Sequence, residues 1–212
     1  MPEEILGKLK IPGYSDYLHP YDETHIIGIG KDVDESIDAD KVHSEGAVYY
    51  TAIQGVKMSL FDVSDVENPK EVSKYIVGDR GTDSLALSDH KAFLFDKQKN
   101  LLVIPILLAE QKNQSVDYYG DFTFQGAYVF ELTLDKGFVL KGRVTHVQDD
   151  SLQKSGYYYY GSGAVKRSLY IGNYLYTLSD KMLKINDLAT LKDVKEVNLP
   201  QSEQQYYYPM IA

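Results

Sequence analysis

Residues 90–147 carry four stretches of strand-like sequence in succession: HKAFLFD (90–96), NLLVIPILL (100–108), GAYVFELTL (126–134) and FVLKGRVTHV (138–147). They are rich in Val, Ile, Leu, Phe and Tyr, and the third carries a short alternation of apolar and polar side chains. Runs of this length and composition, bounded by polar turns, are typical of β-strands. The segment therefore predicts a meander of four antiparallel strands.

The same four-strand unit recurs on both sides of this segment. The predicted strands before it are 15–22, 25–31, 56–63 and 71–78, and those after it are 165–171, 174–179, 181–188 and 193–199. A four-stranded meander does not bury both of its faces alone, so neighbouring units must cover them. Four strands per repeat is typical of propeller blades. We therefore predict an all-β chain with blades at 14–78, 82–147 and 164–199; a plain sandwich of twelve strands is the alternative.

The predicted ring is incomplete. Three blades fall below the four to eight with which propellers close. Residues 5–11 also read as a strand, the outer strand of a preceding blade. We expect a single domain over 1–212 that is an incomplete propeller or a fragment, and its uncovered faces predict self-association.

Composition excludes several functional classes. The 212 residues carry a net charge of −9, from 31 acidic and 22 basic side chains, which argues against binding to nucleic acid. The absence of Cys excludes disulfides, thiolate metal sites and thiol catalysis. No apolar run reaches the roughly 18 residues of a membrane-spanning helix, and the N-terminus lacks the apolar core of a signal peptide.

Two insertions separate the second and third strands of the first two blades. They cover residues 32–54 and 109–125. Equivalent positions in two blades lie at the same rim, so both insertions are expected to emerge from one face. Loops on one face of a rigid scaffold are the usual place for function.

The first insertion begins with acidic residues at alternate positions. The candidate calcium ligands are Asp32, Asp34, Asp38 and Asp40. Calcium takes six to eight hard oxygen ligands, which alternating carboxylates supply in part. The pattern departs from an EF-hand loop at Ile37 and His43, where the Gly and the bidentate Glu belong. The alternative is a solvated acidic loop, and we expect no other cofactor.

The connection between the first two blades, GDRGTDS (78–84), carries a second group of candidates. Arg80, Asp83 and His90 are the predicted binding residues. The planar fork of Arg80 suits a carboxylate or a phosphate. The alternative is that these groups, with Asp79 and Asp89, form ion pairs that hold neighbouring blades together.

Tyrosine is unusually frequent, with 19 residues and no Trp. Tyr118, Tyr119, Tyr157 and Tyr158 lie in predicted loops. Exposed Tyr supplies a large contact area at a small entropic cost, which suits a protein or glycan partner. Packing over the blade edges is the alternative.

A hydrolase is a further alternative. It would require His19, His90 and Asp89 to lie within hydrogen-bond reach of one another. The segment HPYDETH (19–25) also places Asp22 close to His25, but Asp22 is better explained as the residue that caps the turn between two strands.

The longest motifs resemble those of a known family. LKIPGYSDYLHPYDETHIIGIGKD (9–32), GVKMSLFDVSDVENPKEVSKYIVGDRGTDS (55–84), DHKAFLFDKQKNLLVIPI (89–106) and GAYVFELTL (126–134) are similar to the archaeal and bacterial β-propeller domain family. Its members are predicted secreted proteins with a C-terminal propeller distantly related to WD40 repeats. The resemblance implies an extracellular or cell-envelope location and no established enzymatic activity. We therefore expect a non-catalytic binding or scaffold module at the cell surface; a hydrolase and a calcium-stabilised structural module are the alternatives.

Overall fold

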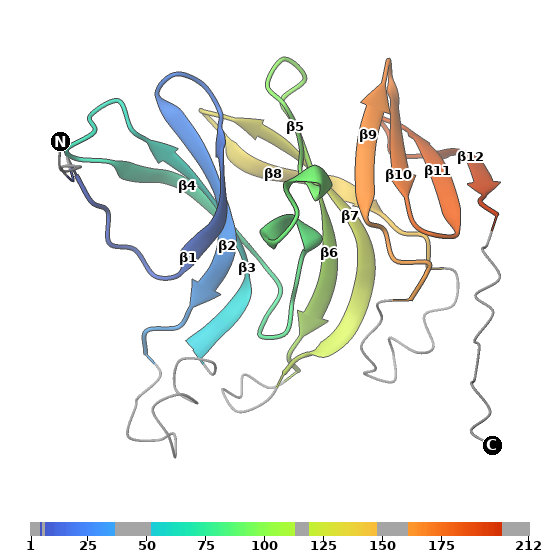
Figure 1. Ribbon diagram of the computed structural model, residues 1–212, viewed down its shortest axis with the longest axis horizontal. Helices are drawn as coiled ribbons and strands as arrows, with labels where there is room; N and C mark the ends of the chain where they lie inside the picture. The colour runs from blue at the N-terminus through green and yellow to red at the C-terminus, as the bar shows by residue number, and fades with distance from the viewer. Residues whose placement is uncertain (1–4, 6, 37–51, 113–118, 148–160, 201–212) are drawn as a thin grey trace, which may run out of the picture.

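The computed structural model describes residue 5 and residues 7–36, 52–112, 119–147 and 161–200. Its twelve strands in these ranges form three antiparallel sheets of four strands (Figure 1). The first sheet holds β1 (Tyr14–Pro20), β2 (His25–Val33), β3 (Ile53–Asp62) and β4 (Lys70–Val77). The second holds β5 (Leu94–Asp96), β6 (Leu101–Glu110), β7 (Asp121–Thr133) and β8 (Gly137–Val144). The third holds β9 (Arg167–Ile171), β10 (Tyr174–Leu178), β11 (Met182–Asp187) and β12 (Asp193–Asn198).

Within each sheet, the strands lie side by side in chain order. The three sheets stand next to one another in the same order, and the last strand of each leads to the first strand of the next (Figure 1). This is the arrangement of consecutive blades in an incomplete β-propeller, as the sequence predicts. We call the three sheets the first, second and third blade.

Two apolar cores lie between the blades. Ile27 and Met58 of the first blade pack with Ile104 and Phe130 of the second, and all four are fully buried. The other face of the second blade packs on the third through a smaller cluster that contains Val103 and Leu175. Strand β6 is thus covered on both faces. This explains why residues 101–109 read as a continuous apolar run rather than as an alternating strand.

The first strand of the second blade, β5, which we call its inner strand, differs from the prediction for residues 90–96. Only Leu94–Asp96 pairs with β6, while Asp83 forms an isolated bridge with Leu107 further along the same edge. Between them, the chain leaves the ladder and forms two short 3-10 helices, η2 (Leu85–Leu87) and η3 (His90–Ala92).

Pro105 of β6 explains this break. The amide and carbonyl of Leu107 both bond to Asp83, so the odd-numbered residues of this part of β6 direct their backbone groups to the inner edge. Pro105 has no N–H to donate there, and the Ser84 hydroxyl donates to its carbonyl at 2.6 Å. A regular inner strand would lose a hydrogen bond at this position.

Two further expectations need correction. Among residues 5–11, the described positions 5 and 7–11 belong to no strand, so the predicted outer strand of a preceding blade is wrong for them. Lys57 donates to the carbonyl of Pro12, and this bond holds the end of the segment against the first blade. The second insertion is shorter than the predicted 109–125, because β6 continues to Glu110 and β7 begins at Asp121. In the described part of the chain, no helix is long and apolar enough to cross a membrane.

Candidate functional site

A pocket of about 390 Å³ opens between the first and second blades, at the rim where β2 and β6 end. It is lined by Lys31, Ile53, Gln54, Arg80, Gly81, Asp83, Tyr119 and Phe122. Ile53 and Gln54 are the last residues of the predicted insertion 32–54, and Tyr119 and Phe122 lie near the end of the predicted insertion 109–125. The prediction that both insertions reach one rim is therefore confirmed for these residues.

Arg80 lies in this pocket against an aromatic ring. Its guanidinium carbon is 4.6 Å from the centroid of Tyr119, and only 9% of the Arg80 surface is exposed. Tyr119, in contrast, is 66% exposed. A guanidinium over an aromatic face is held in a fixed orientation by cation–π attraction and by packing. The pair thus presents a rigid, planar, positively charged surface beside an open ring.

The backbone of the connecting segment is anchored under Arg80. Thr82 exchanges two hydrogen bonds of 3.0 Å with the backbone of Ala109, and the amide of Gly120 donates to the Arg80 carbonyl at 2.8 Å. Gly81 has a φ of +104°, in the region that favours glycine. These contacts fix the segment to the end of β6, so Arg80 and Tyr119 keep their positions relative to both blades.

Lys31 supplies a second positive charge. Its ammonium group donates to the Thr82 carbonyl and lies 3.3 Å from the Asp83 carboxylate. Burial raises the pKa of nearby Asp16; Lys31 opposes this shift, and Asp83 adds to it. Lys31 continues the row of Ile27 and Ile29 on the buried face of β2, which is an unusual place for a lysine.

The pocket brings cationic, aromatic and acidic side chains together. Arg80 and Lys31 attract an anion, Tyr119 and Phe122 offer ring faces, and Asp83 accepts hydrogen bonds. This combination suits a carboxylate attached to a ring or to another flat apolar group.

The predicted calcium ligands lie in a neighbouring pocket or outside the described residues. Asp32 and Asp34 line a pocket of about 590 Å³ together with Glu35 and Asp79. One Asp34 oxygen accepts from the amide and the hydroxyl of Ser36, at 2.9 and 2.6 Å, and so caps a turn. Burial raises the pKa of Asp32, which Lys57 and Lys74 oppose. Asp38 and Asp40 lie outside the described residues. Within the described ranges, no cluster of three or more suitable side chains could hold a metal ion, so calcium stays a prediction.

The groups required for the hydrolase alternative serve other contacts. His19 bonds to the Tyr17 hydroxyl at 2.9 Å, and the exposed His90 ring stacks on Tyr17 with centroids 6.5 Å apart. Asp89 caps η3 through the Lys91 amide and forms an ion pair with Arg167 of the third blade. None of the hydrogen bonds among the described residues joins His19, His90 and Asp89. Asp89 thus holds blades together, in agreement with the structural alternative, but with a partner that the sequence did not indicate.

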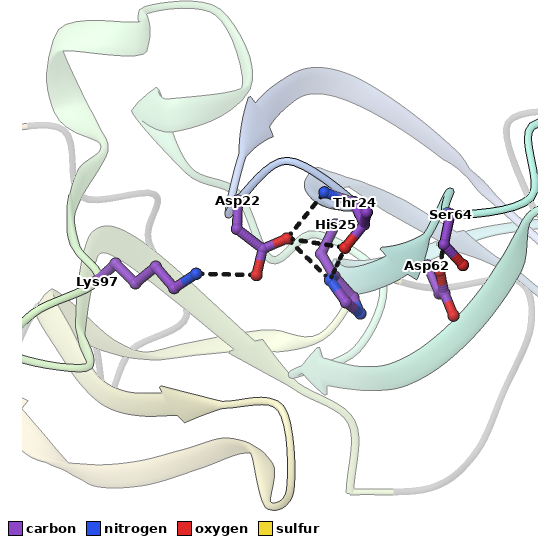
Figure 2. A network of polar contacts seen from close by, with 6 residues as sticks. All are labelled: Asp22, Thr24, His25, Asp62, Ser64 and Lys97. Carbon is purple, nitrogen blue, oxygen red and sulfur yellow. Dashed lines mark hydrogen bonds and ion pairs between the residues drawn. The ribbon is translucent and has the colours of Figure 1, made fainter.

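Asp22 also has a structural role, as predicted (Figure 2). Its Oδ1 accepts from the Thr24 amide at 3.0 Å and lies 2.9 Å from Nδ1 of His25. Its Oδ2 accepts from Lys97 of the second blade at 2.8 Å. The Lys97 bond, together with the bonds from Thr24 and His25, holds the pKa of Asp22 well below its usual range, against the opposing effect of burial. The turn cap is therefore also a tie between two blades.

Sequence reasoning found part of the pocket. Arg80, Asp83 and Tyr119 converge there, whereas His90 lies on η3, outside its lining. Tyr118, Tyr157 and Tyr158 lie outside the described residues. The sequence analysis did not identify Lys31 or Phe122 as pocket residues. Lys31 could have been identified because it interrupts the row of alternate apolar residues Ile27 and Ile29, whereas no sequence pattern marks Phe122.

Comparison with known proteins agrees with the architecture. The family model described as a beta propeller domain matches residues 2–191. An uncharacterized protein of Methanocaldococcus jannaschii is 32% identical over 194 residues, and one of Archaeoglobus fulgidus is 29% identical over 196 residues. Each alignment covers 92% of this chain and 22% of the relative. The chain thus spans about a fifth of the length of these archaeal relatives.

Proposed function

Because this chain belongs to the beta propeller domain family, we propose that it is a non-catalytic binding module of the cell envelope whose ligand is an acidic glycan. The ligand enters the pocket between the first two blades. A sugar carboxylate meets Arg80 and Lys31, and the sugar ring lies against Tyr119.

One observation carries this proposal: a nearly buried guanidinium lies 4.6 Å from a largely exposed tyrosine ring at the mouth of a pocket. Arg recognises a carboxylate through two parallel hydrogen bonds. The exposed ring offers a rigid surface for the apolar face of a sugar. Asp83 adds an acceptor for a hydroxyl group, which a peptide side chain supplies less often than a sugar.

Overall charge favours a ligand with isolated carboxylates. The net charge of −9 repels a densely charged polyanion, which includes an acidic peptide or a nucleic acid. A glycan with one carboxylate per ring places each charge beside apolar and hydroxyl groups. The cell-envelope location rests on the resemblance of the motifs in 9–134 to a family of secreted proteins.

Calorimetric titration with trigalacturonic acid, and with galactotriose as its neutral counterpart, tests the proposal. We expect trigalacturonic acid to bind and galactotriose not to bind. Arg80→Lys keeps the charge but loses the planar fork, and it should weaken binding about tenfold or more. Arg143→Lys is the matched control, because Arg143 also stacks on an aromatic ring, that of Phe124 at 4.7 Å, but lies outside the pocket lining.

Three outcomes would contradict the proposal: equal affinity for the two sugars, no binding of the acidic sugar, or an equal loss in both arginine variants. Tight binding of an oligoglutamate peptide would replace the glycan with an acidic protein segment as the ligand. Detection of the chain by antibody on intact cells tests its location.

A further inference from the structure

The pocket between the first and second blades carries charges of both signs. Lys31, Arg80 and Asp83 are the charged side chains among the described residues that line it. Two positive charges against one negative charge leave this lining with a net charge of +1. One carboxylate of a ligand balances that charge. A second anionic group on the same sugar ring would find no further positive charge among these lining residues.

Asp83 is the more accessible partner of its ion pair. Its side chain is 40% exposed, whereas that of Lys31 is 15% exposed, and the two charged groups lie 3.3 Å apart. Lys31 also donates to the Thr82 carbonyl, so its ammonium group is held by the connecting segment. A ligand that enters the pocket therefore meets more of the carboxylate than of the ammonium group.

The backbone holds Asp83 in place. Its amide donates to the Leu107 carbonyl at 2.9 Å, and its carbonyl accepts from the Leu107 amide at 2.8 Å. These bonds join the connection between the blades to β6 and do not involve the Asp83 side chain. Arg80 and Asp83 stand three positions apart in this anchored segment, so the positive and the negative group of the pocket keep a fixed spacing.

Asp16 of β1 shows that the charge of Asp83 acts on its surroundings. Burial raises the pKa of Asp16; Lys31 opposes this shift, and Asp83 adds to it. The carboxylate of Asp83 thus disfavours a second negative charge close by, although Lys31 pairs with it. An anionic group of a ligand next to Asp83 should meet the same repulsion.

We propose that Asp83 is the specificity-determining residue of this pocket: it admits a sugar ring that carries one carboxylate and rejects a ring that carries a further anionic group, such as a sulfate. The inference rests on the proposed function and narrows its ligand to acidic glycans without sulfate. A binding site gains specificity from a repulsive group as well as from attractive ones. Like charges repel more strongly in a pocket that excludes part of the water, because the local dielectric constant is lower.

A purely structural role of Asp83 makes the opposite prediction. If its carboxylate only held Lys31 in place, Asp83→Asn would weaken the binding of every acidic sugar. If the carboxylate repels a second anion, the same variant gains affinity for the sulfated sugar. Asn has nearly the shape of Asp, so a rejection caused by the bulk of the sulfate would persist in the variant. Loss of folding does not produce a gain of affinity, so the readout is protected against that artefact.

Calorimetric titration at pH 7 and low ionic strength tests the inference. The two ligands are trigalacturonic acid and the same sugar sulfated on one hydroxyl group of each ring. The wild type should bind the sulfated sugar about tenfold or more weakly than trigalacturonic acid. Asp83→Asn should reduce this ratio to about threefold or less, through tighter binding of the sulfated sugar.

Asp180→Asn is the matched control. Asp180 also pairs with a lysine, Lys166, at 2.6 Å, but it lies in the third blade outside the pocket lining. Its replacement changes the net charge equally and should leave both affinities unchanged. Equal affinity of the wild type for the two sugars, a ratio that stays the same in Asp83→Asn, or an equal gain in Asp180→Asn would each overturn this inference alone. Failure of the wild type to bind trigalacturonic acid would overturn the proposed function together with it.

Discussion

The Nε2 atom of His146, which follows the last strand of the second blade, lies 2.8 Å from the hydroxyl oxygen of Thr177 in the third. Its Nδ1 atom lies 3.0 Å from the Ser179 hydroxyl, so both ring nitrogens are bonded across the contact between the two blades. His146 is buried. Burial, with a smaller contribution from Lys184, lowers its pKa to about 4, while Glu196 acts in the opposite direction.

The stability of the contact between the second and third blades should therefore fall in mild acid. An unfolded His takes up a proton near pH 6.5, but folded His146 does so only near pH 4. The contribution of uncharged His146 to the free energy of unfolding is fully present above pH 6.5 and is lost as the pH falls toward 4. The maximum loss of unfolding free energy is roughly 3 kcal/mol. Urea unfolding of the wild type at pH 7.5, 5.5 and 4.5 measures this loss.

The matched variants are His146→Gln and His90→Gln. Replacement of buried His146 should remove most of the loss between pH 7.5 and 4.5, whereas replacement of exposed His90 should leave it unchanged. Identical pH profiles for His146→Gln and the wild type would show that other groups cause the acid sensitivity.

The bond between Asp22 and Lys97 should contribute to the contact between the first two blades. Asp22→Asn removes the ion pair and should lower the free energy of unfolding at pH 7 by about 1 kcal/mol. Because the pKa of Asp22 is depressed, its contribution is present above the ordinary carboxyl pKa near 4 and is lost as the pH falls below it.

Asp65→Asn is the control for this effect. Asp65 accepts from the Glu67 amide at 3.1 Å and from Asn68 at 2.9 Å, so it caps a turn within one blade. A double-mutant cycle with Lys97→Met isolates the pair. A coupling energy of zero between positions 22 and 97 would mean that the bond in Figure 2 adds nothing to stability.

Ser84 should be required for the break in the inner strand of the second blade. Its hydroxyl donates to the Pro105 carbonyl at 2.6 Å and accepts from the Ala86 amide at 3.1 Å. Ser84→Ala leaves two buried backbone groups without these partners and should cost about 1–3 kcal/mol in chemical unfolding. Ser88→Ala changes an exposed serine next to the same 3-10 helix and should cost less than about 0.5 kcal/mol. Equal costs would contradict the role assigned to Ser84.

The existence of most strands could be predicted because the alternation of side chains is a local property. Tyr174, Tyr176 and Leu178 alternate with Leu175 and Thr177 in the sequence as they do across the sheet. The inner edge of the second blade could not be predicted in this way. Its path depends on the missing N–H of Pro105, which lies 21 residues from the serine that compensates for it.

The candidate site was predictable only in part for the same reason. Arg80 and Asp83 stand close together in a polar connection, so the sequence indicates them directly. Lys31 reaches Asp83 across 52 positions, and Asp89 reaches Arg167 across 78. Such pairs depend on how blades stack, and one sequence without that geometry does not identify the partner.

A buried ion pair lies on the face of the first blade that is directed away from the second blade. It gives the sharpest test of how a buried charge is compensated. The Lys57 ammonium lies 3.0 Å from the Glu71 carboxylate and donates to the Pro12 carbonyl at 2.8 Å, while the Ser59 hydroxyl donates to Glu71 at 2.6 Å. Lys57→Met leaves the carboxylate without its cation and should cost about 3–5 kcal/mol in chemical unfolding. The double variant Lys57→Met with Glu71→Leu removes both charges and should recover most of that loss.

Lys166→Met, in the exposed pair with Asp180 at 2.6 Å, is the control and should cost less than about 1 kcal/mol. If the double variant is no more stable than Lys57→Met alone, the cost comes from the lost anchor on Pro12 and not from the unpaired carboxylate.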